Sequence, residues 1–114
     1  MRNMSFFYTQ SQIRSGTKTE TTRAGWNFLK PGNKLMACEK CQGLGKGGKI
    51  VKIRPIEIVK VEKIFANADF YKESNIIAEG FPGMTPEKFI QDILIKKCKC
   101  HYGQDLNRIT FKYV

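Results

Sequence analysis

The stretch from Ile50 to Phe65 alternates, or nearly alternates, between apolar and other residues. Its apolar positions are Ile50, Ile53, Ile56, Ile58, Val59, Val61 and Ile64. Successive side chains of a strand point to opposite faces, so this pattern predicts extended chain with one buried face. Pro55 interrupts the run and cannot donate a hydrogen bond to a neighbouring strand. The stretch therefore predicts either two strands or one long bent strand with Pro55 at an edge or bulge.

Shorter patterns before and after this stretch predict further strands. Strands are expected over Ser5–Tyr8, Thr19–Thr22 and Lys34–Cys38, and over a closing segment in which Ile109, Phe111 and Tyr113 alternate. Thr9 can cap a helical turn over residues 10–15, and Gly16 can end that turn because glycine adopts positive φ without strain. A short helix is expected over Asn67–Glu73, followed by an irregular loop over Glu79–Gly83.

The clearest helix is predicted over Pro86–Lys97. Thr85 is a good N-cap, and proline is favoured at the first helical position. The residues Phe89, Ile90, Ile93 and Leu94 recur at spacings of three and four, so they share the face that enters the core. Together these patterns predict an α+β domain: a small curled sheet or barrel of about five to six strands, with short flanking helices and one main helix.

Length and charge limit the kind of protein this can be. A chain of 114 residues predicts a single domain spanning positions 1–114. No apolar run approaches the roughly 20 residues that a membrane span requires, and no signal peptide is evident, so we expect a cytoplasmic protein without a membrane partner. The formal net charge is +10. Such an excess favours a polyanionic partner, with RNA, DNA or nucleotides ahead of phospholipid.

The octapeptide from Gly16 to Arg23 combines two cations with several hydroxyl groups. Lys18 and Arg23 lie among four threonines. Ammonium and guanidinium groups beside hydroxyls can hold a phosphate, a carboxylate or a polarised carbonyl. The segment is therefore a candidate ligand-binding strand. A solvent-exposed basic edge strand is the alternative.

Taken in order, five segments resemble the ASCH domain, the activating-signal-cointegrator homology family. They are Thr17-Lys18-Thr19 with Arg23, Gly25-Trp26-x-Phe28-Leu29-Lys30-Pro31-Gly32, Gln42-Gly43-Leu44-Gly45-Lys46-Gly47, Glu79-Gly80-Phe81-Pro82-Gly83-Met84-Thr85 and Arg108-Ile109-Thr110-Phe111. These segments span nearly the whole chain. The resemblance implies a PUA-like β-barrel fold. It also implies that RNA or a nucleotide binds in the cleft lined by the lysine-bearing strand, as expected for this family.

The same resemblance implies an alternative activity. Some small ASCH members are amidohydrolases that remove the acetyl group from N4-acetylcytidine, and Lys18, Thr21 and Glu79 match their catalytic positions. Thr21 would attack the carbonyl, Lys18 would take its proton and Glu79 would serve the leaving amine. Residues three apart on a regular strand face opposite ways, so Lys18 and Thr21 can meet only across a bulge or at a strand start.

The remaining binding candidates surround the lysine-bearing strand. Trp26 can stack on a base or pack in the core, and Thr19 adjoins Lys18. Lys46 and Lys49 lie in a glycine-rich stretch that allows close approach to phosphates, or that forms an ordinary flexible loop. The binding residues expected from the sequence are Lys18, Thr19, Thr21, Arg23, Trp26, Lys46, Lys49 and Glu79. The central expectation is that Lys18 and Glu79 line one basic hollow.

The four cysteines form two closely spaced pairs. Cys38 and Cys41 form a C-x-x-C motif, while Cys98 and Cys100 are followed by His101. Two thiolate pairs can close a tetrahedral structural zinc site, with His101 as a substitute ligand. A zinc-containing protein-interaction adaptor is thus a further alternative function. The loop after Cys41 also matches the ASCH pattern, which needs no metal there.

Overall fold

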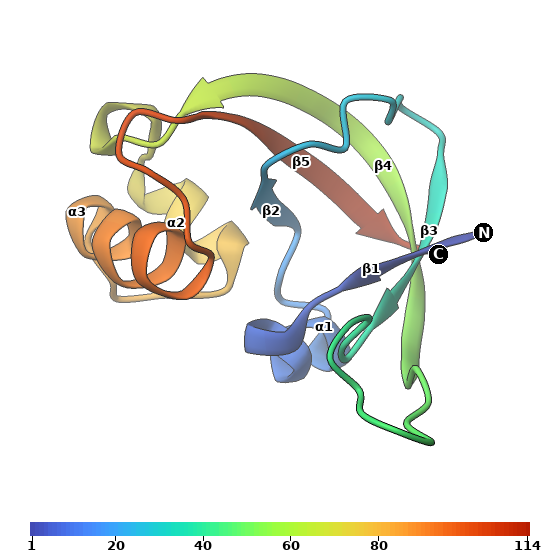
Figure 1. Cartoon of the computed structure of the whole chain (residues 1–114). Coiled ribbons are helices and arrows are strands. Elements are labelled where there is room, and N and C mark those ends of the chain that lie inside the picture. The colour runs from blue at the N-terminus through green and yellow to red at the C-terminus, as the bar shows by residue number, and fades with distance from the viewer.

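The computed structural model describes all 114 residues, and its centre is one strongly curled five-stranded sheet (Figure 1). The strands are β1 (Arg2–Ser5), β2 (Glu20–Arg23), β3 (Lys34–Cys38), β4 (Lys52–Phe65) and β5 (Asp105–Tyr113). Their order in the sheet is β1-β3-β4-β5-β2. The β1–β3 pair is parallel and the other three pairs are antiparallel. This arrangement confirms an α+β fold built on a half-barrel sheet.

The long apolar stretch forms one strand, β4, at the middle of the sheet. It pairs with β3 along its first half and with β5 from Ile56 onward. The pairing with β5 shifts register between Ile58 and Lys60, which leaves Val59 as the extra residue of a bulge. Pro55 lies just before the β5 pairing begins, opposite Met36 of β3. The single-strand alternative is therefore correct. The strand has irregularities at Val59 and also at Ile53, where the pairing with β3 shifts register two residues before Pro55.

The segment after β1 differs from the prediction. The expected strand over residues 5–8 is wrong, because β1 ends at Ser5 and the chain enters a 3-10 turn, η1 (Phe7–Thr9). Phe6 is buried, whereas Phe7 and Tyr8 are each 49% exposed. A short apolar run does not itself distinguish a strand from a helical turn. The following helix, α1 (Gln10–Ser15), ends at Gly16 with φ 79°, as expected.

Two helical elements follow β4, where the sequence predicts one. Asn67 caps a short 3-10 turn, η2 (Ala68–Phe70), by accepting a 2.8 Å hydrogen bond from the Asp69 N–H. The longer helix, α2 (Glu73–Glu79), was not predicted, because only a few of its residues are apolar. The prediction that Glu79 begins an irregular loop is therefore wrong. It is the last residue of α2, which Gly80 closes at φ 102°.

The main helix begins where the sequence predicts. Thr85 accepts a 3.1 Å hydrogen bond from the Lys88 N–H at the start of α3 (Pro86–Phe89). The helix then widens into a π-helical segment, η3 (Ile90–Lys97), which ends with a 2.9 Å bond from the Cys98 N–H to the Ile93 carbonyl. The predicted apolar face is buried. No helix in the structure is long and apolar enough to cross a membrane.

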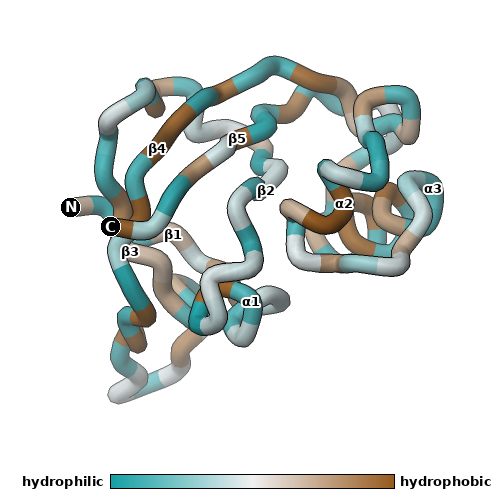
Figure 2. Tube along the Cα trace, turned by 180° about the vertical axis from the view of Figure 1, so that it is seen from behind, coloured by the Kyte–Doolittle hydropathy of each residue, from teal (hydrophilic) through white to brown (hydrophobic).

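The interior consists of two hydrophobic clusters. The first lies inside the curled sheet and includes Met4, Phe6, Ile13, Ile56 and Phe111. The second joins the far ends of β4 and β5 to α2, α3 and η3, and includes Ile64, Ile76, Phe89, Leu94 and Leu106. Figure 2 shows the matching hydrophobic segments along β4 and in α2. The polar residues described below lie where these two clusters meet.

Candidate nucleotide-binding cavity

A cavity of about 360 Å³ opens between β2, η1 and the α2–η3 side of the molecule. Its walls come from both hydrophobic clusters: Phe6 from the first, and Phe89, Ile93 and Leu94 from the second. Its polar lining residues are Ser5, Thr9, Lys18, Thr21, Thr22, Arg23 and Glu79. Apolar and aromatic walls with a few converging polar groups are typical of small-molecule sites. The cavity is therefore the candidate functional site.

Hydrogen bonds near the ends of β2 and α2 hold Lys18 and Glu79 beside each other in the lining of this cavity. The Thr19 N–H donates to the Ala78 carbonyl at 2.9 Å, which ties the approach to β2 to the end of α2. From α1, the Gln12 side-chain amide donates to the Gly80 carbonyl at 3.0 Å. A side chain at position 80 would bring its Cβ within 3.2 Å of the Gln12 side chain. Gly80 thus permits both the positive φ and the close approach of α1.

Lys18 and Glu79 form a buried ion pair. The Lys18 Nζ lies 3.6 Å from Glu79 Oε1, and each side chain is at most 4% exposed. The ammonium also donates to the Glu79 backbone carbonyl. On the other side of the carboxylate, the Thr22 hydroxyl donates to Oε2 at 2.8 Å. Lys18 and Glu79, which the sequence places in one hollow, thus lie next to each other in this cavity.

Burial changes the acid–base character of Lys18. Desolvation of the ammonium lowers the pKa of Lys18, and the nearby Glu79 carboxylate only partly offsets this. The positive charge of Arg23 lowers the pKa of Lys18 further. A lysine in this setting can release its proton more readily than one at the surface.

Thr21 faces Arg23. The Arg23 Nε donates to Thr21 Oγ1 at 3.0 Å, and a second guanidinium nitrogen donates to the Ser5 carbonyl at 2.5 Å. The guanidinium carbon lies 4.8 Å from the centre of the Phe6 ring. Lys18 precedes β2, so Lys18 and Thr21 reach the same cavity at a strand start. No hydrogen bond joins Lys18 to Thr21, so the nucleophile–base contact of the amidohydrolase mechanism is not formed.

A second group of buried polar residues lies behind the ion pair and was not predicted from the sequence. Glu20 accepts a 3.0 Å hydrogen bond from the Asn75 side chain, and its Oε2 lies 3.4 Å from the Nε of Arg108. Burial, and then the hydrogen bond and charge of Glu79, raise the pKa of Glu20 from 4.5 to about 8. Glu20 is therefore protonated at neutral pH, and it shares this buried region with the Glu79 carboxylate.

The proton on Glu20 should make stability depend on pH. The folded protein keeps this proton until about pH 8, whereas the unfolded chain releases it near pH 4.5. Stability should thus fall as pH rises through this window, by up to about 1.4 kcal/mol per pH unit. Glu20→Gln should remove this contribution to the fall in stability. Urea denaturation of the variant and the wild type at several pH values measures it. Parallel curves for the variant and the wild type would contradict the assignment, and Glu57→Gln on β4 is the control.

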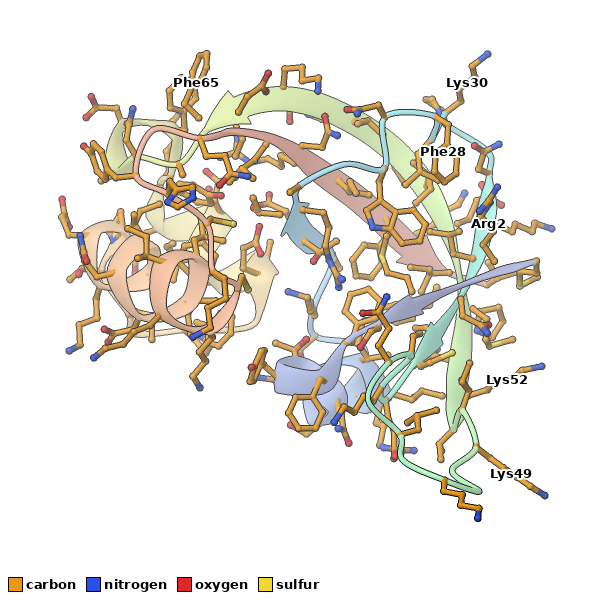
Figure 3. The ribbon with its side chains drawn as sticks, in the orientation of Figure 1. Arg2, Phe28, Lys30, Lys49, Lys52 and Phe65 are labelled. Atoms are coloured by element: carbon orange, nitrogen blue, oxygen red, sulfur yellow. The ribbon has the colours of Figure 1, made fainter.

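The other predicted binding residues divide into two groups. Trp26 lines the cavity, and its φ of 61° follows the left-handed Gly25. A non-glycine residue in this region carries strain, and such strain is common at functional sites. Thr19 is not part of the lining. Lys46 and Lys49 are exposed in the loop between β3 and β4, and Figure 3 shows Lys49 at the tip of that loop, away from α3.

The four cysteines lie in two parts of the structure. Cys38 is buried at the end of β3 and Cys41 lies in the next loop, whereas Cys98 and Cys100 line the cavity after η3. The structure contains no group of three or more cysteine, histidine or carboxylate side chains placed to hold a metal ion. The zinc site therefore stays a prediction from the spacing of the cysteines.

Comparison with known proteins identifies a fold and no family. No family model matches the sequence, and no curated protein matches it. Among solved structures, the chain is similar to protein EF3133 from Enterococcus faecalis, a crystal structure assigned to the DUF984 family. The TM-score is 0.71 at 17% sequence identity, with 100% of this chain and 76% of EF3133 covered. This likeness shows that the two chains share a fold.

Proposed function

We propose that this protein is a nucleotide-binding module whose cavity receives the nucleoside part of its ligand. The observation that carries the proposal is the convergence of Lys18, Thr21, Arg23 and Glu79 in one cavity of about 360 Å³ with aromatic walls. This volume lies within the range of small-ligand sites, which begins at roughly 300 Å³. The sequence resemblance to the ASCH family and the net charge of +10 point in the same direction.

The buried ion pair supplies both kinds of hydrogen-bonding group that a nucleobase edge requires. Bases present amino donors beside carbonyl or ring-nitrogen acceptors. The Glu79 carboxylate can accept a hydrogen bond from an amino group of the base. The Lys18 ammonium, whose Nζ lies 3.6 Å from Glu79 Oε1, can donate to an adjacent acceptor on the same base. The pair therefore matches the polarity of such an edge.

The aromatic and cationic groups nearer the opening match the rest of a nucleotide. Trp26 lines the cavity and can stack on a base. The Arg23 guanidinium can donate to a phosphate oxygen in exchange for its present bond to Ser5. A binding function is favoured over a hydrolytic one because the Thr21 hydroxyl is hydrogen-bonded to Arg23 and not to Lys18. The amidohydrolase activity stays a prediction from the resemblance.

Arg23→Ala should weaken nucleotide binding by about tenfold or more, since a hydrogen bond to a charged group contributes roughly 1.5–3 kcal/mol. The measurement is calorimetric titration with a mixture of the four ribonucleoside 5′-monophosphates. Affinity should also fall as salt concentration rises. Lys52→Ala is the charge-matched control, because Lys52 lies at the start of β4 and outside the cavity lining (Figure 3). Absence of binding, or equal weakening by both substitutions, would refute the proposal.

A further inference from the structure

The opening of the cavity carries exposed aromatic rings that continue its wall onto the surface. Phe7 and Tyr8 of η1 both line the cavity, yet each is 49% exposed. Their rings meet edge to face, with centres 5.1 Å apart. Covering the exposed half of each ring with a binding partner would be favourable. Two adjacent exposed aromatic residues at the mouth of a cavity therefore indicate a contact surface.

A lysine ammonium lies over each of these two rings. The Lys40 ammonium, from the loop after β3, lies 5.2 Å from the centre of the Phe7 ring. The Lys97 ammonium, from the end of η3, lies 5.1 Å from the centre of the Tyr8 ring. Neither lysine forms an ion pair with a carboxylate. Three segments distant in sequence thus bring two rings and two unpaired cations together, and we call these four residues the rim.

The rim has the composition of a surface for a single nucleic-acid strand. Base stacking on aromatic rings and phosphate contacts from nearby cations are the two interactions that hold such strands. A peptide of aspartate and glutamate would satisfy the cations but has no aromatic faces to stack on the rings. Lys40 and Lys97 lie outside the cavity lining, so a ligand that fills the cavity and also contacts these two cations must extend beyond the nucleoside in the cavity.

We infer that the nucleotide bound in the cavity belongs to single-stranded RNA, whose neighbouring nucleotides lie on the rim formed by Phe7, Tyr8, Lys40 and Lys97. The inference rests on the proposed function and names the molecule from which the nucleotide comes. RNA is preferred to DNA because its 2′-hydroxyl is a donor as well as an acceptor. The Glu79 carboxylate, which can accept such a bond, lines the same cavity.

The test measures the affinities of two double variants for one oligonucleotide and for mononucleotides. Lys40→Ala/Lys97→Ala removes the rim cations, and Lys60→Ala/Lys112→Ala is the control. The control removes the same charge from β4 and β5, where these lysines pair with Glu62 and Glu57. The probes are a fluorescein-labelled, random-sequence RNA decanucleotide, read by anisotropy, and the mixture of ribonucleoside 5′-monophosphates, read by calorimetry.

The wild-type protein should bind the decanucleotide more tightly than the monophosphates. The rim variant should lose about tenfold in decanucleotide affinity while its monophosphate affinity stays unchanged. Its plot of log Kd against log salt should also become shallower by about 0.7 for each lysine that contacts a phosphate. The control variant should change decanucleotide affinity by less than about twofold, because its lysines lie outside the rim and only the overall charge differs.

Several outcomes would overturn the inference. Equal losses in the rim and control variants would show that the rim does not contact the strand. Equal affinity for a DNA decanucleotide would refute the choice of RNA, and equally effective competition by polyglutamate would assign the rim to an acidic protein. Failure to bind monophosphates would instead refute the proposed function. If the decanucleotide still bound and its binding still depended on the rim lysines, the rim would remain a strand-binding surface. The cavity would then not be a nucleotide site.

Discussion

Lys18→Met is expected to lower the free energy of unfolding by about 3–5 kcal/mol, because it leaves the Glu79 carboxylate buried without its cation. Both side chains of the pair are at most 4% exposed, so solvent compensates only weakly for the lost partner. Glu79→Gln should cost less. The Lys18 ammonium left behind has a lowered pKa and can neutralise itself by losing a proton. Urea denaturation of both variants at neutral pH measures the difference.

The double variant Lys18→Met/Glu79→Leu separates stability from function. It removes both charges together, and well-packed apolar replacements of a buried ion pair are often neutral for stability. We therefore expect it to be more stable than Lys18→Met while losing the proposed nucleotide binding. If Lys18→Met destabilised the protein by less than about 1 kcal/mol, the pair would not be buried as the structure has it.

The second large effect is expected at Phe6, which belongs to the core and to the cavity wall. Its ring is 1% exposed, packs against Phe111 at a centroid distance of 5.7 Å and lies under the Arg23 guanidinium. Phe6→Ala should lower the free energy of unfolding by about 3–5 kcal/mol, since it removes most of a buried ring and leaves a cavity. Thermal or urea denaturation measures this loss.

Phe6→Leu distinguishes the two roles of this ring. Leucine keeps an apolar group in the core, so the loss of stability should be smaller than for alanine. It has no aromatic face for the Arg23 guanidinium, so nucleotide affinity should still fall. Phe111→Leu is the matched control: Phe111 belongs to the same cluster but does not line the cavity. Equal nucleotide affinities for the two leucine variants would contradict the role assigned to the Phe6 ring.

Local sequence patterns predicted much of the framework. The alternation over residues 50–65 identified β4, and Thr85-Pro86 identified the start of α3, because each depends on interactions between near neighbours. The strand over residues 34–38 was placed at its observed bounds. By contrast, α2 was missed, since its stability comes from packing Ile76 into the second hydrophobic cluster and the isolated heptapeptide carries little helical pattern.

The candidate site was predictable only in part. Lys18, Thr21, Arg23, Trp26 and Glu79 were named from local motifs and the ASCH resemblance, and all five line one cavity. The Glu20–Arg108 pair was not foreseen. It forms because β2 lies beside β5 in the sheet, and that register depends on the whole topology. The rim was missed for the same reason, since Lys40 and Lys97 reach η1 only after the chain has folded.

The most direct test of the central claim is an NMR titration of ¹⁵N-labelled protein with the ribonucleoside 5′-monophosphates. If Lys18 and Glu79 form the floor of a nucleotide site, the amide shifts should concentrate in β2, in η1 and around Glu79 to Phe81, with saturation as ligand is added. Shifts confined to the exposed lysines of the loop between β3 and β4, or no shifts at all, would contradict the claim.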